Sequence, residues 1–435
     1  MFKDTIRTIG ARYLVAFLNL LLIFINSKVL GREGMGIVGI IYASANLIVI
    51  FNSIFCGNTI VYFMNRYNLR TVFLPAYCWA FTGSAIASIF LYFFHFLPEG
   101  YELAVFCLAV VISLVTANSL MMLGKDRINI FNFLFILQGS LLFLFLIIVY
   151  FIFGYKDING YLAGLLGASV IALLCSMMWL IRYLRKKNNN PVGKPFHAIL
   201  KEMFFYGLWS SADNLAEGLT TRLNYFLIQQ TGGYGLVGLL DAGTKVSESV
   251  WHISNSVCFI AYNRVSKTTD RQEQKRVTLQ LFKLTYCALI IVMAVICCIP
   301  EWVYTDYLLT PEFADIRKII SGLSLGIVAF GSNRVISHYF IGSGNIKYSA
   351  FCSALGLAIL LVAGIVLIPA HGVFGAAITS SIAYAGMLLF SIIVFMKQTG
   401  ASFIELIPAK ADWDEALKKM KTVFLINRRQ AASRQ

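Results

Sequence analysis

The amino-acid sequence predicts an all-α polytopic membrane protein with about twelve transmembrane helices. Three observations lead to this fold class. Of the 435 residues, 58% are hydrophobic and only 13% are charged, whereas soluble globular chains carry about 25% charged residues. The apolar residues form runs of roughly 20, the length that an α-helix needs to cross a bilayer. The basic residues concentrate in every second connection between these runs.

The apolar runs fall into two halves of six predicted spans each. A basic, polar stretch with two prolines, which disfavour a continuous helix, separates the halves. We predict an N-terminal half at 1–181, a basic cytoplasmic linker at 182–201, a C-terminal half at 202–396 and a tail at 397–435. The predicted spans are 13–30, 37–58, 72–94, 103–123, 130–153, 160–181, 203–230, 235–262, 279–299, 319–341, 348–368 and 373–396.

The distribution of Lys and Arg predicts the orientation of these spans. With the N-terminus inside, the cytoplasmic segments hold 27 of the 36 basic residues. The external connections hold four, which are Arg32, Lys156, Arg317 and Lys318. By the positive-inside rule, both termini are expected in the cytoplasm. The formal charge of +15 is then a signal of topology, and we expect no nucleic-acid partner.

A short repeat relates the two halves. Residues 34–43 (GMGIVGIIYA) align without gaps to residues 233–242 (GYGLVGLLDA), each at the mouth of the second span of its half. Since each half has six spans, the halves would share one orientation and be related by an axis along the membrane normal. Chance similarity between glycine-rich apolar segments is the alternative. Both copies contain G-x-G-x-x-G, which without a βαβ unit indicates tight turns and close helix packing.

The predicted span 235–262 carries four ionisable residues. Asp241, Lys245, Glu248 and His252 are spaced by four, three and four, so they fall on one face of a helix. An ionised side chain in hydrocarbon costs about 2.5 to 3.5 kcal/mol on insertion scales. This stripe is therefore expected to face water or polar partners.

Further polar residues lie in other predicted spans. The seventh span carries Asp213, Glu217 and Arg222, and on an unbroken helix Arg222 points about 140° away from Glu217. Hence these three cannot all line one narrow groove unless the helix is broken. The remaining candidates for a polar cavity are Asn19, Asn26, Asn46, Asn118 and, beside Arg334 in the tenth span, His338.

Two interpretations fit these charged residues. In the structural one, Asp241 pairs with Lys245, Glu248 pairs with Lys245 or His252, and the pairs hold the helices together. In the functional one, they line a water-filled cavity, because charged residues inside the membrane usually mark pathways. In that cavity Arg222, Lys245 and Arg334 could bind a phosphate or pyrophosphate.

The acidic residues have a separate expected role. Asp213, Glu217, Asp241 and Glu248 could take up H⁺ or Na⁺ as a coupling ion, and His252 or His338 could titrate near neutral pH. We expect no other cofactor and no metal site, since the nine cysteines form no CxxC pair and no histidine cluster has ligand spacing. The tail at 397–435 is expected to form a basic amphipathic helix on membrane lipids.

Several motifs resemble one family of transporters. Residues 30–36 (LGREGMG) are similar to the LG-x-x-x-(Y/F)G signature of the multidrug/oligosaccharidyl-lipid/polysaccharide exporter superfamily. Residues 231–237 (TGGYGLV) resemble the junction of the seventh and eighth spans in its polysaccharide flippases. Residues 341–345 (IGSGN) and 367–377 (LIPAHGVFGAA) are similar to the pattern of its tenth to twelfth spans.

The resemblance implies a V-shaped alternating-access carrier in the bacterial inner membrane. It would flip a polyprenyl-pyrophosphate-linked oligosaccharide for O-antigen, lipopolysaccharide, capsule or exopolysaccharide synthesis. Polysaccharide polymerase and export proteins would be its partners. The family's cationic cavity would here use Lys28, Arg222, Lys245 and Arg334. One departure is that the second span carries no charge, which argues against an ion site in the N-terminal half.

Two other functions remain open at this point. A drug/cation antiporter of the same superfamily would share the fold, although basic cavity residues disfavour cationic substrates. A membrane glycan polymerase or ligase would also have a dozen spans. Such an enzyme normally needs a large external loop with catalytic groups, and the external connections here are short. We therefore expect a transporter and no enzyme.

Overall fold

The computed structural model describes residues 2–64, 67, 69–125, 127–184, 195–266, 268 and 270–408. These residues form helices and connections, with no strand among them, so the predicted all-α class is confirmed. The central residues of the linker, 185–194, and most of the tail, 409–435, lie outside the described residues. The linker and the amphipathic tail helix therefore stay predictions.

The first part of the chain forms six α-helices and one short π-helix. Their bounds are α1 Phe2–Cys56, α2 Asn58–Met64, α3 Leu69–Phe93, α4 Glu102–Gly124, α5 Ile128–Ile147, η1 Ile148–Ile152 and α6 Ile158–Leu184. The second part continues with α7 Phe196–Glu248, α8 Trp251–Val265, α9 Arg271–Cys298, η2 Val303–Leu308, η3 Pro311–Phe313, α10 Ile316–Gly342, α11 Lys347–Thr399 and α12 Phe403–Leu406.

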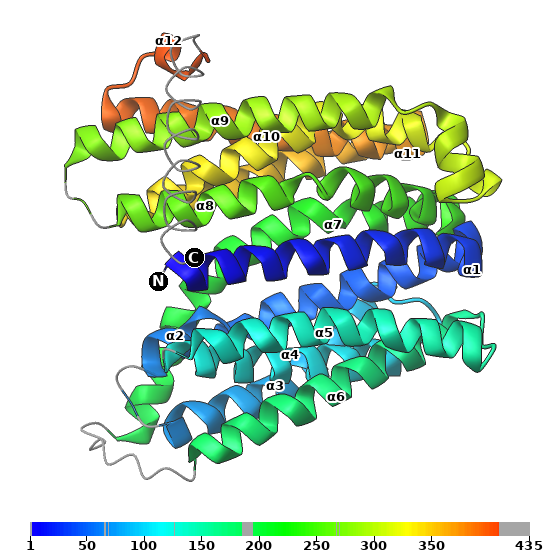
Figure 1. Cartoon of the computed structure of the whole chain (residues 1–435), viewed down its shortest axis with the longest axis horizontal. Helices are drawn as coiled ribbons and strands as arrows, with labels where there is room; N and C mark the ends of the chain where they lie inside the picture. The colour runs from blue at the N-terminus through cyan, green and yellow to red at the C-terminus, as the bar shows by residue number, and fades with distance from the viewer. Residues whose placement is uncertain are drawn as a thin grey trace, which may run out of the picture.

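Three of these helices run through the turn between two consecutive predicted spans. The chain turns within α1, α7 and α11 at Gly31, Gly233 and Gly372, whose φ angles are 65°, 74° and 56°. Side chains with a Cβ rarely adopt such angles, so glycine suits each turn. Figure 1 shows the two legs of α1, with the second returning toward the end from which the first began.

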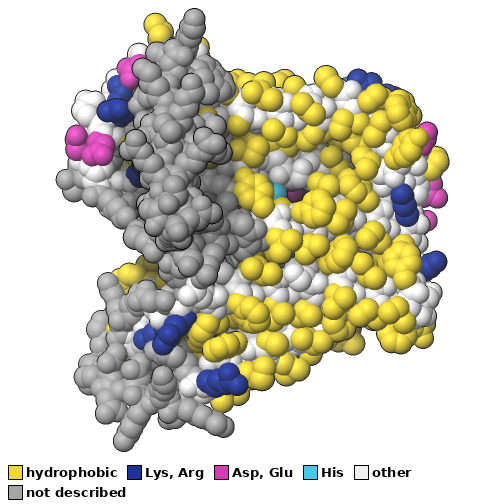
Figure 2. Space-filling view, viewed as in Figure 1, with side chains coloured by type: hydrophobic (Ala, Val, Ile, Leu, Met, Phe, Trp, Pro, Cys, Tyr) yellow, Lys and Arg dark blue, Asp and Glu magenta, His cyan; other side chains and the backbone are white. Residues whose placement is uncertain are grey.

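Among the described residues, eight helices are long and apolar enough to cross a membrane. Two of these, at 13–64 and 347–399, have 52 and 53 residues, enough for two crossings each. The chain is therefore a multi-pass membrane protein. Figure 2 shows its flank covered by apolar side chains, with the charged ones lying toward the two ends of the helices.

One predicted helix is interrupted. The sequence suggested a continuous span at 235–262, but α7 ends at Glu248 and α8 begins at Trp251. Between them the N–H of Val250 donates to the carbonyl of Ser247, and that of His252 donates to Ser249, three residues back instead of four. The prediction of one regular helix is wrong here because this turn is wound more tightly, as in a 3₁₀-helix.

The helices are arranged around α1 and α7. Figure 1 shows α3, α4, α5 and α6 on one side and α8, α9, α10 and α11 on the other. Between the two groups α1 and α7 pack extensively against each other. Buried residues of α1, including Ile23, Ile40 and Leu47, belong to the same apolar core as residues of α7, α10 and α11.

The two copies of the repeat meet at the end where α1 and α7 turn. A Cβ on Gly36 would overlap the carbonyl oxygen of Tyr234, and a Cβ on Gly238 would overlap that of Arg32. Each would also lie 3.0 Å from the backbone nitrogen of the other glycine. The glycines of both motifs thus allow two helix legs to touch backbone to backbone, the packing role predicted for them.

We expect Gly238→Ala to lower the free energy of unfolding by about 1–3 kcal/mol, because the added methyl group must push the two legs apart. Gly235→Ala is the matched control within the same motif, since its Cβ would lie 3.9 Å from the nearest atom, Nε of Arg32. Thermal unfolding of the detergent-solubilised chain measures both variants. Equal unfolding midpoints for the two variants would contradict the close contact between Gly36 and Gly238.

Candidate functional site: two cavities joined by an ion pair

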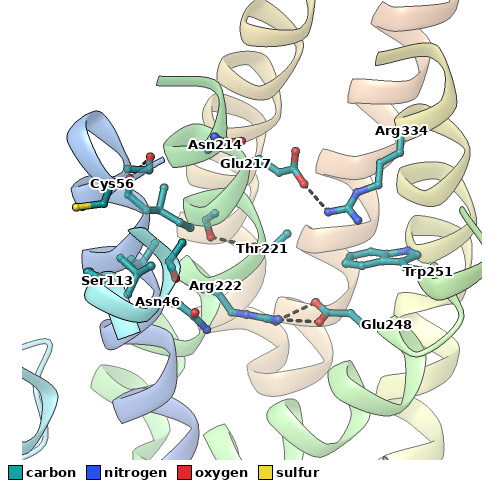
Figure 3. A pocket seen from close by; sticks show the side chains of 16 residues that line it. Asn46, Cys56, Ser113, Asn214, Glu217, Thr221, Arg222, Glu248, Trp251 and Arg334 are labelled. Carbon is teal, nitrogen blue, oxygen red and sulfur yellow. Dashed lines mark hydrogen bonds and ion pairs between the residues drawn. The ribbon is translucent and has the colours of Figure 1, made fainter. Parts of the chain in front are cut away.

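A cavity of about 420 Å³ lies between the two groups of helices. One wall, from α1 and α4, is uncharged and includes Asn46, Ser53, Ser113 and Thr116. The facing wall, from α7, α8 and α10, is charged and includes Glu217, Arg222, Glu248 and Arg334, with Trp251 between the charged pairs (Figure 3). The two walls therefore offer different chemistry to one ligand.

Arg222 and Glu248 form a two-point ion pair in the charged wall. Nη1 and Nη2 of Arg222 donate to the two carboxylate oxygens of Glu248 over 2.8 and 2.7 Å (Figure 3). The side chains are only 22% and 14% exposed. The guanidinium also lies 5.5 Å from the ring centroid of Tyr225. This is the strongest geometry for an ion pair between side chains.

Arg334 forms the second pair of the same wall. Its Nη2 donates to Glu217 over 2.6 Å, and its Nη1 donates to the side-chain oxygen of Asn255 over 2.6 Å. The guanidinium carbon lies 5.4 Å from the ring of Trp251 and 5.0 Å from that of Phe330. Aromatic faces attract a cation, so this guanidinium is held from two directions.

A second cavity of about 300 Å³ adjoins the first. It shares Arg222, Glu248 and Trp251 with the first, so the ion pair stands in a common wall. It adds Asp241 and Lys245, whose Nζ donates to the Asp241 carboxylate over 2.7 Å. Its polar lining is completed by Asn19, Asn26, Tyr42, Tyr161, Ser249, His252 and Asn255.

The structure thus brings together most of the predicted site residues. The stripe from Asp241 to His252 faces the second cavity despite the tight turn within it. Glu217 and Arg222 share the first cavity, because it is wide enough to be lined from both directions. Asn46 lines the first cavity, and Asn19 and Asn26 line the second.

Four predicted site residues lie elsewhere. Lys28 donates to the carbonyl of Tyr307 in η2 over 2.8 Å, at the end where α1 turns. Asn118 bonds with Tyr77 and Ser176 among α3, α4 and α6. Nδ1 of His338 lies 2.8 Å from the Arg334 carbonyl. None of these three, nor Asp213, is among the residues that line the two cavities.

Asp213 has its own polar setting on α7. Its two carboxylate oxygens accept hydrogen bonds from Ser353 and Ser349 of α11 over 2.6 and 2.8 Å. Within the described part of the chain it forms no ion pair, in contrast to the three carboxylates of the cavities. It is therefore the intramembrane carboxylate whose charge is least compensated among the predicted set.

The charge of the cavities differs from the cationic lining that the family resemblance implied. Each of the three basic side chains that line them is bonded to a carboxylate: Arg222 to Glu248, Lys245 to Asp241, and Arg334 to Glu217. The pair of Asp241 and Lys245 follows from their spacing in sequence. Glu248 instead binds Arg222, 26 residues away across the turn of α7, and no local pattern indicates that pair.

We expect Arg222→Leu alone to destabilise the protein by about 3–5 kcal/mol, because it leaves the Glu248 carboxylate buried without a partner. Arg222→Leu combined with Glu248→Leu should recover most of this loss, since no charge then remains to be compensated. Thermal unfolding of the single and double variants measures the coupling. If the double variant is no more stable than either single variant, the loss in Arg222→Leu does not come from an uncompensated Glu248 carboxylate.

Comparison with known proteins finds similar three-dimensional structures. No family model matches the sequence, and no curated protein matches it. A multidrug resistance MATE family transporter of the MOP superfamily, in an inward-facing conformation, superposes with a TM-score of 0.69 at 15% identity, over 89% of this chain and 94% of that one. The lipid II flippase MurJ, in an inward closed conformation, gives 0.67 at 17% identity, over 98% and 92%.

A further similar structure is a MOP superfamily transporter from Pyrococcus furiosus, described as having a binding pocket of reverse polarity. It superposes with a TM-score of 0.57 at 14% identity, over 91% of this chain and 94% of that one. Identities this low establish the fold alone. At that level the resemblance inferred from the sequence is confirmed: the chain has the fold of the MOP superfamily of membrane transporters.

Proposed function

We propose that this protein flips a polyprenyl-pyrophosphate-linked oligosaccharide from the cytoplasmic to the external leaflet of the bacterial inner membrane, by alternating access. The observation that carries the proposal is the pair of unlike walls around the first cavity. Amides and hydroxyls on one wall suit the hydroxyl groups of a sugar. Two guanidinium groups on the other suit phosphate oxygens, which they can bind in a bidentate manner.

The lipid part of the substrate has a suitable route. Figure 2 shows an opening in the apolar flank, over the region where α1 and α8 lie in Figure 1, with histidine and acidic side chains inside. The second cavity is lined by these same helices. A prenyl chain could stay in the bilayer while its head group enters there. One of the similar structures is, by name, a lipid II flippase, a protein that moves a lipid-linked substrate.

Contacts at the end where the helices turn support alternating access. The Arg32 N–H donates to the Glu312 carboxylate and its Nε to the carbonyl of Gly235, both over 2.8 Å. With the contact between Gly36 and Gly238, these bonds join α1, α7 and η3 into a closed end. By the positive-inside rule this end is external, so the cavities would be reached from the cytoplasm in this state.

A cation exporter is the second candidate. The observation that favours it is the presence of two carboxylates, Glu217 and Glu248, in the first cavity beside the two arginines. A cationic drug could bind these carboxylates as readily as an anion binds the guanidinium groups. A similar structure is, by name, a multidrug resistance transporter.

Flipping of a fluorescent lipid-linked oligosaccharide in sealed proteoliposomes tests the proposal. We expect Arg222→Gln and Arg334→Gln each to lower the initial rate roughly 10- to 100-fold, since each removes a charge-assisted hydrogen bond of about 1.5–3 kcal/mol. Lys347→Gln is the control, a basic residue outside both cavities. Normal flipping by all variants would place the pathway elsewhere, and transport of cationic dyes alone would favour the exporter.

Ion coupling is the second part of the proposal, and Asp213 is its best-supported residue. A carboxylate with two hydroxyl donors and no ion-pair partner among the described residues can exchange H⁺ or Na⁺ without breaking an ion pair. We expect Asp213→Asn to keep a basal flipping rate but to lose its acceleration by an imposed pH or Na⁺ gradient. Asp157→Asn, in the connection before α6, is the matched control. A gradient response that persists in Asp213→Asn would contradict this role.

A further inference from the structure

Glu248 binds the guanidinium of Arg222 in the geometry that a substrate phosphate would use. Both carboxylate oxygens accept from the two terminal nitrogens, over 2.8 and 2.7 Å, in the wall between the cavities (Figure 3). A phosphate offers the same pair of oxygens to an arginine. The two anions therefore compete for this edge of the guanidinium, and neither can bind it in this manner while the other is present.

If Glu248 were displaced from Arg222, the other basic side chains of the cavities would already be bonded to carboxylates. The other lining residues of the two cavities with a basic side chain are Lys245, bonded to Asp241, and Arg334, bonded to Glu217. Its other titratable neighbours are Tyr225 of α7, Tyr384 of α11 and His252 of α8. Tyrosines cannot supply positive charge, and His252 could supply it only by taking up a proton itself. An ionised carboxylate without a partner is costly in such a site, so Glu248 tends to take up a proton instead.

We infer that substrate binding exchanges one anion for another on Arg222: the substrate's phosphate displaces the Glu248 carboxylate, which then takes up one proton from water. The inference rests on the proposed function, because it assumes an anionic substrate in these cavities. In the empty carrier, Glu248 keeps the guanidinium compensated. In the loaded carrier, the phosphate does so and Glu248 is neutral.

This exchange makes binding depend on pH in a defined direction. Where Glu248 is ionised in the empty protein, each bound substrate takes up a proton, so affinity rises as pH falls. For a single linked proton the change is up to tenfold in Kd per pH unit. Glu248→Gln removes both the competing charge and the proton. We expect this variant to bind the substrate roughly tenfold more tightly than the wild type does at pH 8, with a Kd that does not change with pH.

The experiment uses the full chain in detergent and isothermal titration calorimetry between pH 6 and 8.5. The probe is a short-chain prenyl-pyrophosphoryl-N-acetylglucosamine, whose phosphates stay fully ionised over this range. Titrations in two buffers with different ionisation enthalpies count the protons taken up by the wild type, which requires no variant to fold. We expect close to one proton at pH 8.

Two variants serve as controls. Glu405→Gln removes a carboxylate that is bonded to Lys275 outside both cavities, and it should bind as the wild type does. His252→Gln removes the titratable neighbour in the second cavity, and it should keep the linked proton. If His252→Gln abolishes the proton uptake, or if Glu248→Gln retains it, the inference is overturned.

The remaining outcomes separate this inference from the proposed function. If the wild type binds the probe with no proton uptake at any pH, the exchange is wrong while the proposed substrate stands. If neither the wild type nor Glu248→Gln binds the probe at any pH, the proposed substrate is wrong and the inference fails with it.

Discussion

The cost of placing charge inside a membrane explains how the centre of this protein is built. Each guanidinium or ammonium group in the cavities is bonded to a carboxylate, and two of the three pairs join segments far apart in sequence. Arg222 and Glu248 connect the two legs of α7, and Arg334 and Glu217 connect α10 to α7. These pairs fix the helices around a polar space that hydrocarbon alone would not keep open. The same pairs leave that space close to electrically neutral when it is empty.

Local patterns in the sequence predict part of this arrangement. The spacing from Asp241 to His252 indicates one polar face, and that face lines the second cavity. The glycines at 233–238 indicate a turn and close packing, and both are present. What local spacing cannot indicate is a partner on another helix or beyond a turn. Hence the bond between Arg222 and Glu248, and the bonds from Ser349 and Ser353 to Asp213, emerge only from the packed structure.

The two halves of the chain contribute unequally to the cavity. Asn46 occupies the repeat position that corresponds to Lys245, and the wall it belongs to holds amides and hydroxyls. In the same half, Asn52 donates hydrogen bonds to Ser84 and Ser113. The buried polar side chains of this cluster are therefore neutral as well. Neutral groups bind a ligand by shape and hydrogen bonds, with little sensitivity to salt or pH. Under the proposed function, the charged half would respond to ions, while the neutral half would distinguish between sugars.

The contact between Gly36 and Gly238 has a consequence for how such a chain could arise. The contact is made on one side only, although Gly36 aligns with Gly235 and Gly238 with Gly39 in the repeat. A Cβ on Gly235 would lie 3.9 Å from Nε of Arg32 and one on Gly39 would meet the Asp241 side chain, so the second pair does not touch backbone to backbone. If one half once existed as a separate protein, two identical copies could have paired through this motif, and one substitution would have changed both sides together. Fusion into one chain frees the two sides to differ. Position 46 could then stay an amide while position 245 became a lysine.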